Sequence, residues 1–521
     1  MKKYYREQNA VLANQFIQAA DLYGPSPALK LKGFEYTYNT LKQNATAIAL
    51  QILEREDKTH NVVAVWGSPS LAAYAGIPGI LMASCAYVPM NPRFPTERNL
   101  FVYERSGAEI LVLGPEDFEE VNRLFTDYPR KPLLIFSGND TLPEGLANSG
   151  FKYLSARPSE KNDIPGITSR ISDMAYLMFT SGSTGIPKGV PVSNGNVLAY
   201  LDNLATIMNF SPSDRFSQTF DLTFDLSVHD LFACWLSGAC LCIPDERYSL
   251  TMAKYLRKEK ISVWFSVPSL AVLMQKMRLL KENAFPDLRY SLFCGEPLLL
   301  ETATVWALAA PASKLFNLYG PTETTIAISA YHFNPAEGHS KSRNGILSIG
   351  KIFPGHLTGF GSREEDKILN ISGPQVVNGY FNDEKAANDS FSCVDGLTWY
   401  NTGDRVEKDA DGDMFFLGRN DHEIKISGYR VNILEIEHAI REKCGKNAVA
   451  IPLRNDDETV KEIVAFIEDP LNQVKEEELR HALTLKLPWY MIPASFRKLE
   501  KFPLNQNLKI DRKKLEIICF S

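Results

Sequence analysis

The sequence predicts an α/β fold with parallel strands, arranged as a large domain followed by a smaller one. Short apolar runs, typical of buried strands, alternate with polar or helical stretches through most of the chain, as at 62–66, 110–113 and 133–136. A length of 521 residues exceeds what one ordinary core accommodates. The pattern changes after about residue 420. We therefore expect a large N-terminal domain of layered sheets and helices over residues 1–420, and a small, mobile α+β domain over residues 421–521.

The individual elements follow in chain order. No Asp, Glu, Lys or Arg occurs in 62–92, but glycines and prolines interrupt this stretch, so it predicts a strand, a core-facing helix and a turn rather than a membrane span. The run 174–179 predicts another buried strand, and Cys240 and Cys242 flank one Leu on a third. After a turn at 418–421, the pattern predicts a helix at 436–443, strands at 449–452 and 462–467, and a helix at 476–486.

Composition narrows the class of protein. Apolar residues make up 45% of the chain and charged residues 23%, and these fractions are ordinary for a soluble protein. The net charge of −6 gives no sign of a nucleic-acid partner. The eight cysteines form no C-x-x-C pair and no zinc-type cluster, so we expect reduced thiols. No apolar segment follows the basic N-terminus. These features predict a cytoplasmic protein without a signal peptide and without a membrane partner.

The segment 180–189, TSGSTGIPKG, directly follows the predicted strand at 174–179. Its glycines allow backbone N–H groups to approach an anion closely, and its hydroxyls and lysine add donors and positive charge. The Walker spacing fails, because Pro187 precedes the lysine and Gly189 follows it. Glycines alone are equally typical of a plain loop. The whole string predicts a phosphate-binding loop that contains Thr180, Ser181, Gly182, Ser183, Thr184 and Lys188.

This string resembles the phosphate loop of the adenylate-forming superfamily, which includes acyl-CoA synthetases, luciferases and the amino-acid adenylation domains of peptide synthetases. Further segments match the superfamily in the same order and cover nearly the whole chain, namely 34–38, 81–91, 317–325, 400–404, 418–430 and 502–512. The resemblance implies the adenylate-forming enzyme fold, with ATP and Mg²⁺ as cofactors. It also implies a nucleotide site that includes Gly295, Glu296, Pro297, Asn317, Leu318, Gly320 and Phe416.

The segment NLYGPTETT at 317–325 carries an aromatic ring and a carboxylate on one loop. By resemblance, Tyr319 stacks on adenine, Thr322 contacts phosphate and Glu323 holds Mg²⁺. Magnesium prefers oxygen ligands and bridges them to phosphate oxygens, which agrees with this role for a glutamate. A β-turn with a solvated glutamate is the alternative reading.

Two later segments extend the nucleotide site. In YNTGD, the resemblance implies that Asp404 accepts hydrogen bonds from both ribose hydroxyls, which suits an ionised carboxylate. Asn401 stands in that motif where the family usually has Arg. In GRNDHEIKISGYR, the resemblance implies that Arg419 contacts ribose or phosphate, that Asp421 is the hinge, and that Gly428 lines a thiol tunnel after domain rotation.

The last matching segment, FPLNQNLKIDR, aligns Lys509 with the family's catalytic lysine. By resemblance, Lys509 reaches the substrate carboxylate and the α-phosphate, where it offsets developing negative charge. A lysine on a C-terminal loop is otherwise a solvated charge. Leu508 replaces the family's glycine, which could adopt a positive φ freely.

The segment FDLSVHDLF at 224–232 indicates which acid is activated. Amino-acid adenylation domains carry an Asp at the position of Asp225, where it pairs with the substrate ammonium group. A buried unpaired carboxylate beside an apolar acid is costly, so Asp225 favours an amino acid, although an Asp at a helix start is the alternative. The remaining pocket residues, carried over by resemblance, are Leu226, His229, Phe265, Leu292, Cys294, Leu318, Ile326 and Ala327.

This mostly apolar lining predicts a compact apolar amino acid. Two free-standing subfamilies are most similar, the proline–carrier protein ligases and the D-alanine–carrier protein ligases, and the lining favours L-proline. The expected reaction is formation of an aminoacyl-adenylate, followed by transfer to a phosphopantetheine thiol. Too few residues follow Lys509 for a carrier domain, so we expect a separate carrier protein.

Two rival functions stay open from the sequence. An acyl-CoA synthetase would share the ATP residues, but Asp225 argues against it. A non-catalytic nucleotide-binding scaffold is the alternative from another class. The presence of Lys509, Glu323 and Asp404 argues against a scaffold.

Overall fold

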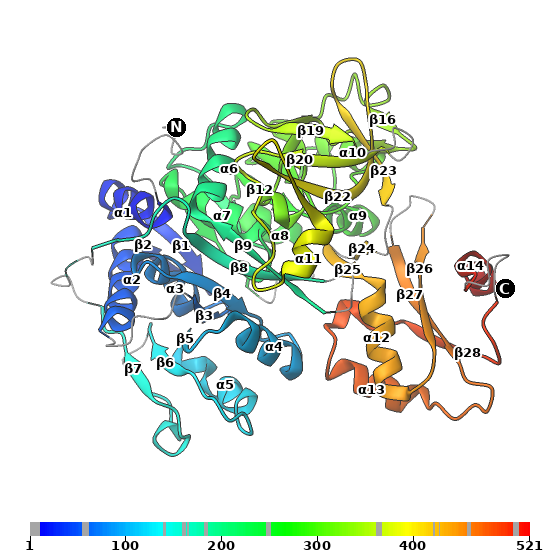
Figure 1. Cartoon of the computed structure of the whole chain (residues 1–521). Helices are drawn as coiled ribbons and strands as arrows, with labels where there is room; N and C mark the ends of the chain where they lie inside the picture. Colours follow the sequence, from blue (N-terminus) through cyan, green and yellow to red (C-terminus); the bar gives the residue numbers. More distant parts are fainter. Residues whose placement is uncertain are drawn as a thin grey trace.

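The computed structural model confirms the mixed α/β fold (Figure 1). It describes residues 11–54, 62–138, 142–158, 163, 166–181, 186–245, 252–360, 367–419, 423–426, 428–455, 460–503 and 510–520.

A seven-stranded sheet has the order β7-β6-β5-β3-β4-β8-β9, and its strands are parallel except for the β8–β9 pair. Three short apolar runs predicted from the sequence form β3, β5 and β6, with the predicted bounds. The strands are β3 (Val62–Trp66), β4 (Ala86–Met90), β5 (Ile110–Leu113), β6 (Leu133–Phe136), β7 (Tyr153–Ser155), β8 (Met174–Thr180) and β9 (Lys188–Ser193).

A nine-stranded sheet has the order β18-β15-β14-β13-β12-β10-β11-β1-β2. The six strands from β14 to β1 in this order are parallel, which aligns the carboxyl ends of β12, β13 and β14 at one edge. The strands are β1 (Pro27–Leu31), β2 (Phe34–Thr37), β10 (Arg215–Ser217), β11 (Cys240–Cys242), β12 (Val263–Ser266), β13 (Tyr290–Phe293), β14 (Lys314–Tyr319), β15 (Ser329–His332) and β18 (Lys351–Ile352).

The largest core cluster joins the two sheets, because it contains Val63 and Tyr87 from one sheet, and Leu29 and Phe216 from the other. Buried residues of α1, α2, α3 and α7 belong to the same cluster. The helices up to residue 390 are α1 (Leu12–Tyr23), α2 (Tyr38–Leu53), α3 (Leu71–Met82), α4 (Thr96–Ser106), α5 (Phe118–Leu124), α6 (Asn194–Ile207), α7 (Leu226–Leu236), α8 (Met252–Lys258), α9 (Pro268–Lys276), α10 (Leu300–Ala309) and α11 (Glu384–Ser390), with 3₁₀ turns at Pro115–Asp117, Leu146–Asn148 and Thr322–Thr324.

A third, antiparallel sheet packs beside the end of β14 and supplies one wall of the site. Its strands are β19 (Leu357–Phe360), β20 (Ile368–Ser372), β21 (Phe391–Val394), β22 (Leu397–Lys408) and β23 (Met414–Arg419), and a short hairpin pairs β16 (Ser342–Arg343) with β17 (Ile346–Leu347).

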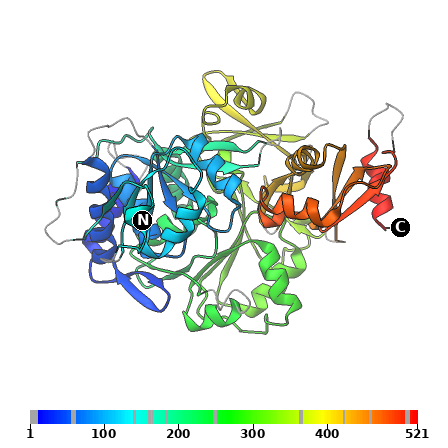
Figure 2. The ribbon, with the colours of Figure 1, turned by 90° about the horizontal axis from the view of Figure 1, so that it is seen from below.

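The residues after 422 form a hairpin and a three-stranded sheet with their own core cluster, to one side of the other sheets (Figures 1 and 2). The predicted elements at 436–443, 449–452 and 462–467 lie within α12, β26 and β27. The predicted helix at 476–486 corresponds to α13, which ends two residues earlier. The elements are β24 (Glu423–Ile426), β25 (Tyr429–Asn432), α12 (Ile433–Cys444), β26 (Ala448–Arg454), β27 (Val460–Glu468), α13 (Glu476–Thr484), a 3₁₀ turn (Trp489–Met491), β28 (Ser495–Leu499) and α14 (Arg512–Phe520).

Contacts between this C-terminal region and the preceding sheets are specific and partly buried. Arg98 donates to Glu435 at 2.9 Å, and both side chains are buried. The Tyr429 hydroxyl donates to Asp221 at 2.9 Å, and its ring stacks on Tyr490. The predicted hinge, Asp421, lies outside the described residues. Within the described part of the chain, no helix combines the length and the apolar character needed to cross a bilayer.

Candidate active site

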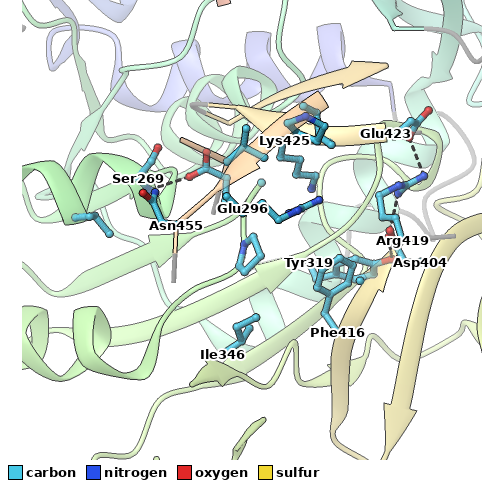
Figure 3. A pocket seen from close by; sticks show the side chains of 18 of the residues that line it. Ser269, Glu296, Tyr319, Ile346, Asp404, Phe416, Arg419, Glu423, Lys425 and Asn455 are labelled. Carbon is cyan, nitrogen blue, oxygen red and sulfur yellow. Dashed lines mark hydrogen bonds and ion pairs between the residues drawn. The ribbon is translucent and has the colours of Figure 1, made fainter. Parts of the chain in front are cut away.

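A cavity of about 480 Å³ lies where the carboxyl ends of β13 and β14 meet the third sheet and the C-terminal region (Figure 3). Ligands of open α/β sheets commonly bind beyond the carboxyl ends of the parallel strands. Several distant segments therefore converge on one space, as the nucleotide-site expectation requires. The predicted nucleotide residues that line it are Gly295, Glu296, Pro297, Asn317, Leu318, Tyr319, Asp404, Phe416 and Arg419.

Asp404, the expected ribose ligand, is buried on β22 at the wall of this cavity. The Tyr319 hydroxyl donates to Asp404 Oδ2 at 2.5 Å, and Arg419 donates to Oδ1 at 2.5 Å (Figure 3). Burial and the neighbouring Asp404 charge raise the pKa of Tyr319 well above its usual value, so Tyr319 remains a donor. These contacts fix the orientation of the carboxylate.

Glu296 connects α9 to the tip of the β24–β25 hairpin. One of its carboxylate oxygens accepts from the Ser269 amide at 2.8 Å, at the start of α9 (Figure 3). The other accepts from the Gly428 amide at 2.6 Å. The hairpin is therefore docked at the mouth of the site, with Gly428 where the resemblance expects a tunnel-lining residue.

Glu323 lies on the 3₁₀ turn after β14 and is only 1% exposed. It accepts from Arg430 at 2.7 Å and from the Tyr380 hydroxyl at 2.8 Å. Burial raises the pKa of Glu323, but Arg430 and Tyr380 outweigh it, so the pKa lies below the usual value. An ionised carboxylate beside Thr322, which lines the adjoining cavity, fits the needs of a Mg²⁺ ion that also binds substrate phosphates.

The glycine-rich segment connects β8 and β9, whose Thr180 and Lys188 lie opposite each other. Ser181 donates to the Arg430 carbonyl at 2.8 Å. Lys188 is buried, and its Nζ lies 4.8 Å from the centre of the Tyr380 ring. Gly182, Ser183, Thr184 and Lys509 lie outside the described residues.

Asp225 immediately precedes α7 and lines a smaller cavity of about 80 Å³. Its Oδ2 accepts from the Ile326 amide at 3.3 Å. Ile326 and Thr325 both have a positive φ, of 69° and 58°, which is strained for β-branched residues and is typical of functional sites. Burial raises the pKa of Asp225 to about 6, although the Ile326 amide and the Thr322 hydroxyl oppose the shift. Among the residues that the structure describes, no cationic side chain forms an ion pair with this carboxylate, and a substrate ammonium group would supply that partner.

The predicted side-chain pocket is mostly filled. Leu226 and Cys294 line the small cavity beside Asp225, and Leu318 lines the larger one. In the described part of the chain, the other predicted pocket residues line neither cavity and are fully or almost fully buried. They are His229, Phe265, Leu292, Ile326 and Ala327.

His229 explains this filling. Its ring packs 4.6 Å from Phe265, and its Nδ1 is hydrogen-bonded to the Tyr200 hydroxyl at 2.7 Å. Burial lowers the pKa of His229 to about 3, so the imidazole is neutral. The ring is therefore a fixed part of the core behind Asp225, rather than a cationic group facing a ligand.

Three further residues at the site had no assigned role in the sequence. Glu423 and Arg430 lie inside the matching segment 418–430, but a motif alone does not reveal which side chains they contact. Tyr380 lies in none of the quoted motifs and carried no local signal. The structure brings Tyr380 and Arg430 onto one carboxylate, that of Glu323.

Comparison with known proteins agrees with this geometry. A family model described as "AMP-binding enzyme" matches residues 16–381. The chain belongs to the AMP-binding enzyme family. As an AMP-binding enzyme, it is an ATP-dependent, adenylate-forming ligase.

Relatives of this AMP-binding enzyme match almost its whole length. The D-alanine–D-alanyl carrier protein ligase of Staphylococcus haemolyticus is 28% identical over 94% of this chain and 95% of that protein. The Vibrio cholerae adenylation domain AlmE, solved with glycyl-adenosine-5′-phosphate, is 28% identical, with a TM-score of 0.87 over 98% of this chain and 97% of that one. IdnL7 is 32% identical, with a TM-score of 0.72 over 98% of each chain.

Proposed function

We propose that this enzyme activates an amino acid whose side chain is no larger than a methyl group, glycine or D-alanine, and transfers it to the phosphopantetheine thiol of a separate carrier protein. The observation that carries the proposal is the buried carboxylate of Asp225 at a cavity of about 80 Å³. Two relatives support this size class, namely the D-alanine–D-alanyl carrier protein ligase and AlmE, which was solved with glycyl-adenosine-5′-phosphate.

In the first half-reaction, a carboxylate oxygen of the amino acid attacks the α-phosphorus of ATP, and the bond to pyrophosphate breaks. Asp225 holds the ammonium group, which orients the carboxylate for attack. Tyr319 and Asp404 hold adenine and ribose, and Lys509 with the phosphate loop offsets the developing charge. Glu323 would hold Mg²⁺, which when bound neutralises phosphate charge.

In the second half-reaction, the carrier thiol attacks the acyl carbonyl, the bond to AMP breaks, and the thiol proton is released. The large cavity extends from the nucleotide residues to Ser269 and Leu273 of α9 and to Arg512 of the C-terminal region. This extension suits the approach of a long pantetheine arm. The docked position of Gly428 beside Glu296 is the arrangement that we assign to this half-reaction.

The sequence favoured L-proline, whereas the packing favours a smaller substrate. His229 and Phe265 were expected to line the side-chain pocket, but both are fully buried and line neither cavity in the described structure, which leaves less room for a pyrrolidine ring. An acyl-CoA synthetase is disfavoured, because an apolar acid would leave the Asp225 carboxylate unpaired. A non-catalytic scaffold is disfavoured, because Asp404 and Glu323 retain the chemistry of a nucleotide site.

Pyrophosphate exchange with single amino acids tests the proposal. Glycine or D-alanine should give the highest kcat/KM. L-Proline should be poorer by at least about 10–200-fold, because even one extra methylene in an apolar pocket has an effect of that size. Removing the imidazole with His229→Ala should raise L-proline activity relative to D-alanine. The matched control Tyr200→Phe removes the hydrogen bond but keeps the ring volume, so it should leave the preference unchanged. Highest activity with L-proline in the unaltered enzyme would contradict the size assignment.

Activity toward the amino acid should fall in acid. The pKa of Asp225 is raised to about 6, so its carboxyl is ionised above this pH and protonated below it. Only the ionised form pairs with an ammonium group. We expect kcat/KM for glycine to decline as the pH falls through about 6, because this parameter reports groups of the free enzyme. A pH profile of pyrophosphate exchange checks this, and a flat profile down to pH 5 would exclude Asp225 as the ammonium partner.

A further inference from the structure

The β24–β25 hairpin places a cation on the carboxylate that we assign to Mg²⁺. Arg430 Nη1 lies 2.7 Å from Glu323 Oε2, and only 1% of the Glu323 side chain is exposed. The Ser181 contact to the Arg430 carbonyl and the Gly428 contact to Glu296 fix the hairpin on both sides of this pair. The guanidinium is therefore held at Glu323 by backbone as well as side-chain contacts.

Arg430 is also the end of a chain of alternating charges. Glu423 accepts from Arg430 at 2.7 and 3.0 Å, and it pairs with Arg419 at 2.7 Å. Arg419 in turn pairs with Asp404 at the nucleotide cavity (Figure 3). Glu423 thus orients Arg430 toward Glu323. The charged side chains of this network are all mostly buried.

From this geometry we infer that Arg430 and the divalent cation of the nucleotide are alternative partners of Glu323. A buried carboxylate requires a compensating charge, and removing the only cation near it is strongly unfavourable. Of the two carboxylate oxygens, one accepts from Tyr380 and the other from Arg430. A divalent cation bound through Glu323 would face the positive guanidinium 2.7 Å from Oε2, so repulsion between the two cations makes each displace the other.

The inference rests on the proposed role of Glu323 and adds an order of events to it. The metal belongs with ATP and pyrophosphate in the first half-reaction. The docked hairpin belongs with the thiol in the second. Loss of the metal with pyrophosphate leaves Glu323 uncompensated, and insertion of Arg430 then stabilises the docked hairpin. Because linkage is reciprocal, the metal weakens hairpin docking by the same factor by which docking weakens metal binding.

Metal affinity provides the first test. Mn²⁺ binding is measured by electron paramagnetic resonance on the full-length enzyme with α,β-methylene-ATP and without amino acid. Arg430→Gln should bind Mn²⁺ more tightly by about tenfold, a typical coupling between two sites. Arg430→Lys keeps the charge and should stay close to the unaltered enzyme. Unchanged Mn²⁺ affinity in Arg430→Gln would overturn the inference and leave the proposed function standing.

Hairpin position provides a second readout that does not depend on activity. Spin labels are placed on the exposed Cys393 of β21 and on Lys475→Cys, a site 75% exposed near α13, in a Cys444→Ser background. Adding Mg²⁺ to the enzyme with α,β-methylene-ATP should change the distance distribution between the labels.

In Glu323→Gln the labels should no longer respond to Mg²⁺, and Mn²⁺ affinity should fall. If Mn²⁺ affinity is unaffected in Glu323→Gln, the metal role of Glu323 fails, and the inference fails with it. The amino-acid preference in pyrophosphate exchange is a separate measurement, so its failure would be recognised on its own.

Discussion

Replacement of Asp225 by alanine is expected to lower kcat/KM for the amino acid by roughly two to four decades, because removing one member of a buried charged pair costs about 3–5 kcal/mol. The substrate ammonium group would then enter a buried site without a carboxylate to receive it. ATP affinity should stay within a small factor of the original, since Asp225 lies beside the smaller cavity and not the larger one in the described structure. Pyrophosphate exchange at varied glycine or D-alanine, with ATP saturating, checks the first part, and direct nucleotide binding checks the second.

Asp230 offers a matched control for this experiment. It lies on the same helix, α7, and it is also fully buried. Burial raises the pKa of Asp230 well above its usual range, which favours the uncharged carboxyl. Asp230→Asn should therefore preserve amino-acid activation. An equal loss in Asp225→Ala and Asp230→Asn would mean that α7 responds to any substitution, and would remove the assigned role of Asp225.

Replacement of Lys509 by alanine is expected to suppress adenylate formation by about 10²–10³-fold, the usual effect of removing one donor that stabilises transition-state charge. Thioester transfer from preformed adenylate should decrease much less, because attack on the α-phosphorus, the step to which we assign Lys509, is already complete in the preformed adenylate. Rapid-quench measurement of each half-reaction separates the two.

Lys501→Ala is the matched control for Lys509→Ala, since it removes an exposed lysine shortly before the matching segment FPLNQNLKIDR. It should leave both half-reactions intact. Equal losses of both half-reactions in Lys509→Ala would contradict a role confined to adenylation.

The sequence predicted the parts of the fold that depend on local pattern. The runs at 62–66, 110–113 and 133–136 form β3, β5 and β6, because apolar runs of four or five residues are short enough for buried strands and too short for most helices. Sheet order was not predictable in this way. Leu29 of β1 pairs with Leu241 of β11, and nothing near either residue records a partner more than two hundred positions away.

For the candidate site, too, motifs identified single residues but not the contacts between them. Motifs pointed to Asp225, Glu323 and Asp404 as candidate site residues. In the structure Asp225 and Asp404 line cavities, and Glu323 contacts Arg430, which lines the smaller cavity. Their partners were not identified, because Arg430 and Glu323 meet only through the folded hairpin. The same limit applied to His229, whose position in a motif suggested a lining residue. In the structure, Tyr200 and Phe265 contact the His229 ring and bury it.

Cys294 bears on the enzyme's resistance to self-acylation. Its thiol lines the small cavity with Asp225, where an activated acyl group would form. The thiolate is the nucleophilic form of cysteine, and burial raises the pKa of Cys294 to about 12. At neutral pH fewer than about one in 10⁴ of these thiols would be ionised. A sulfur atom can therefore stand beside a reactive mixed anhydride without capturing the acyl group, which leaves the anhydride for the thiol that arrives from outside.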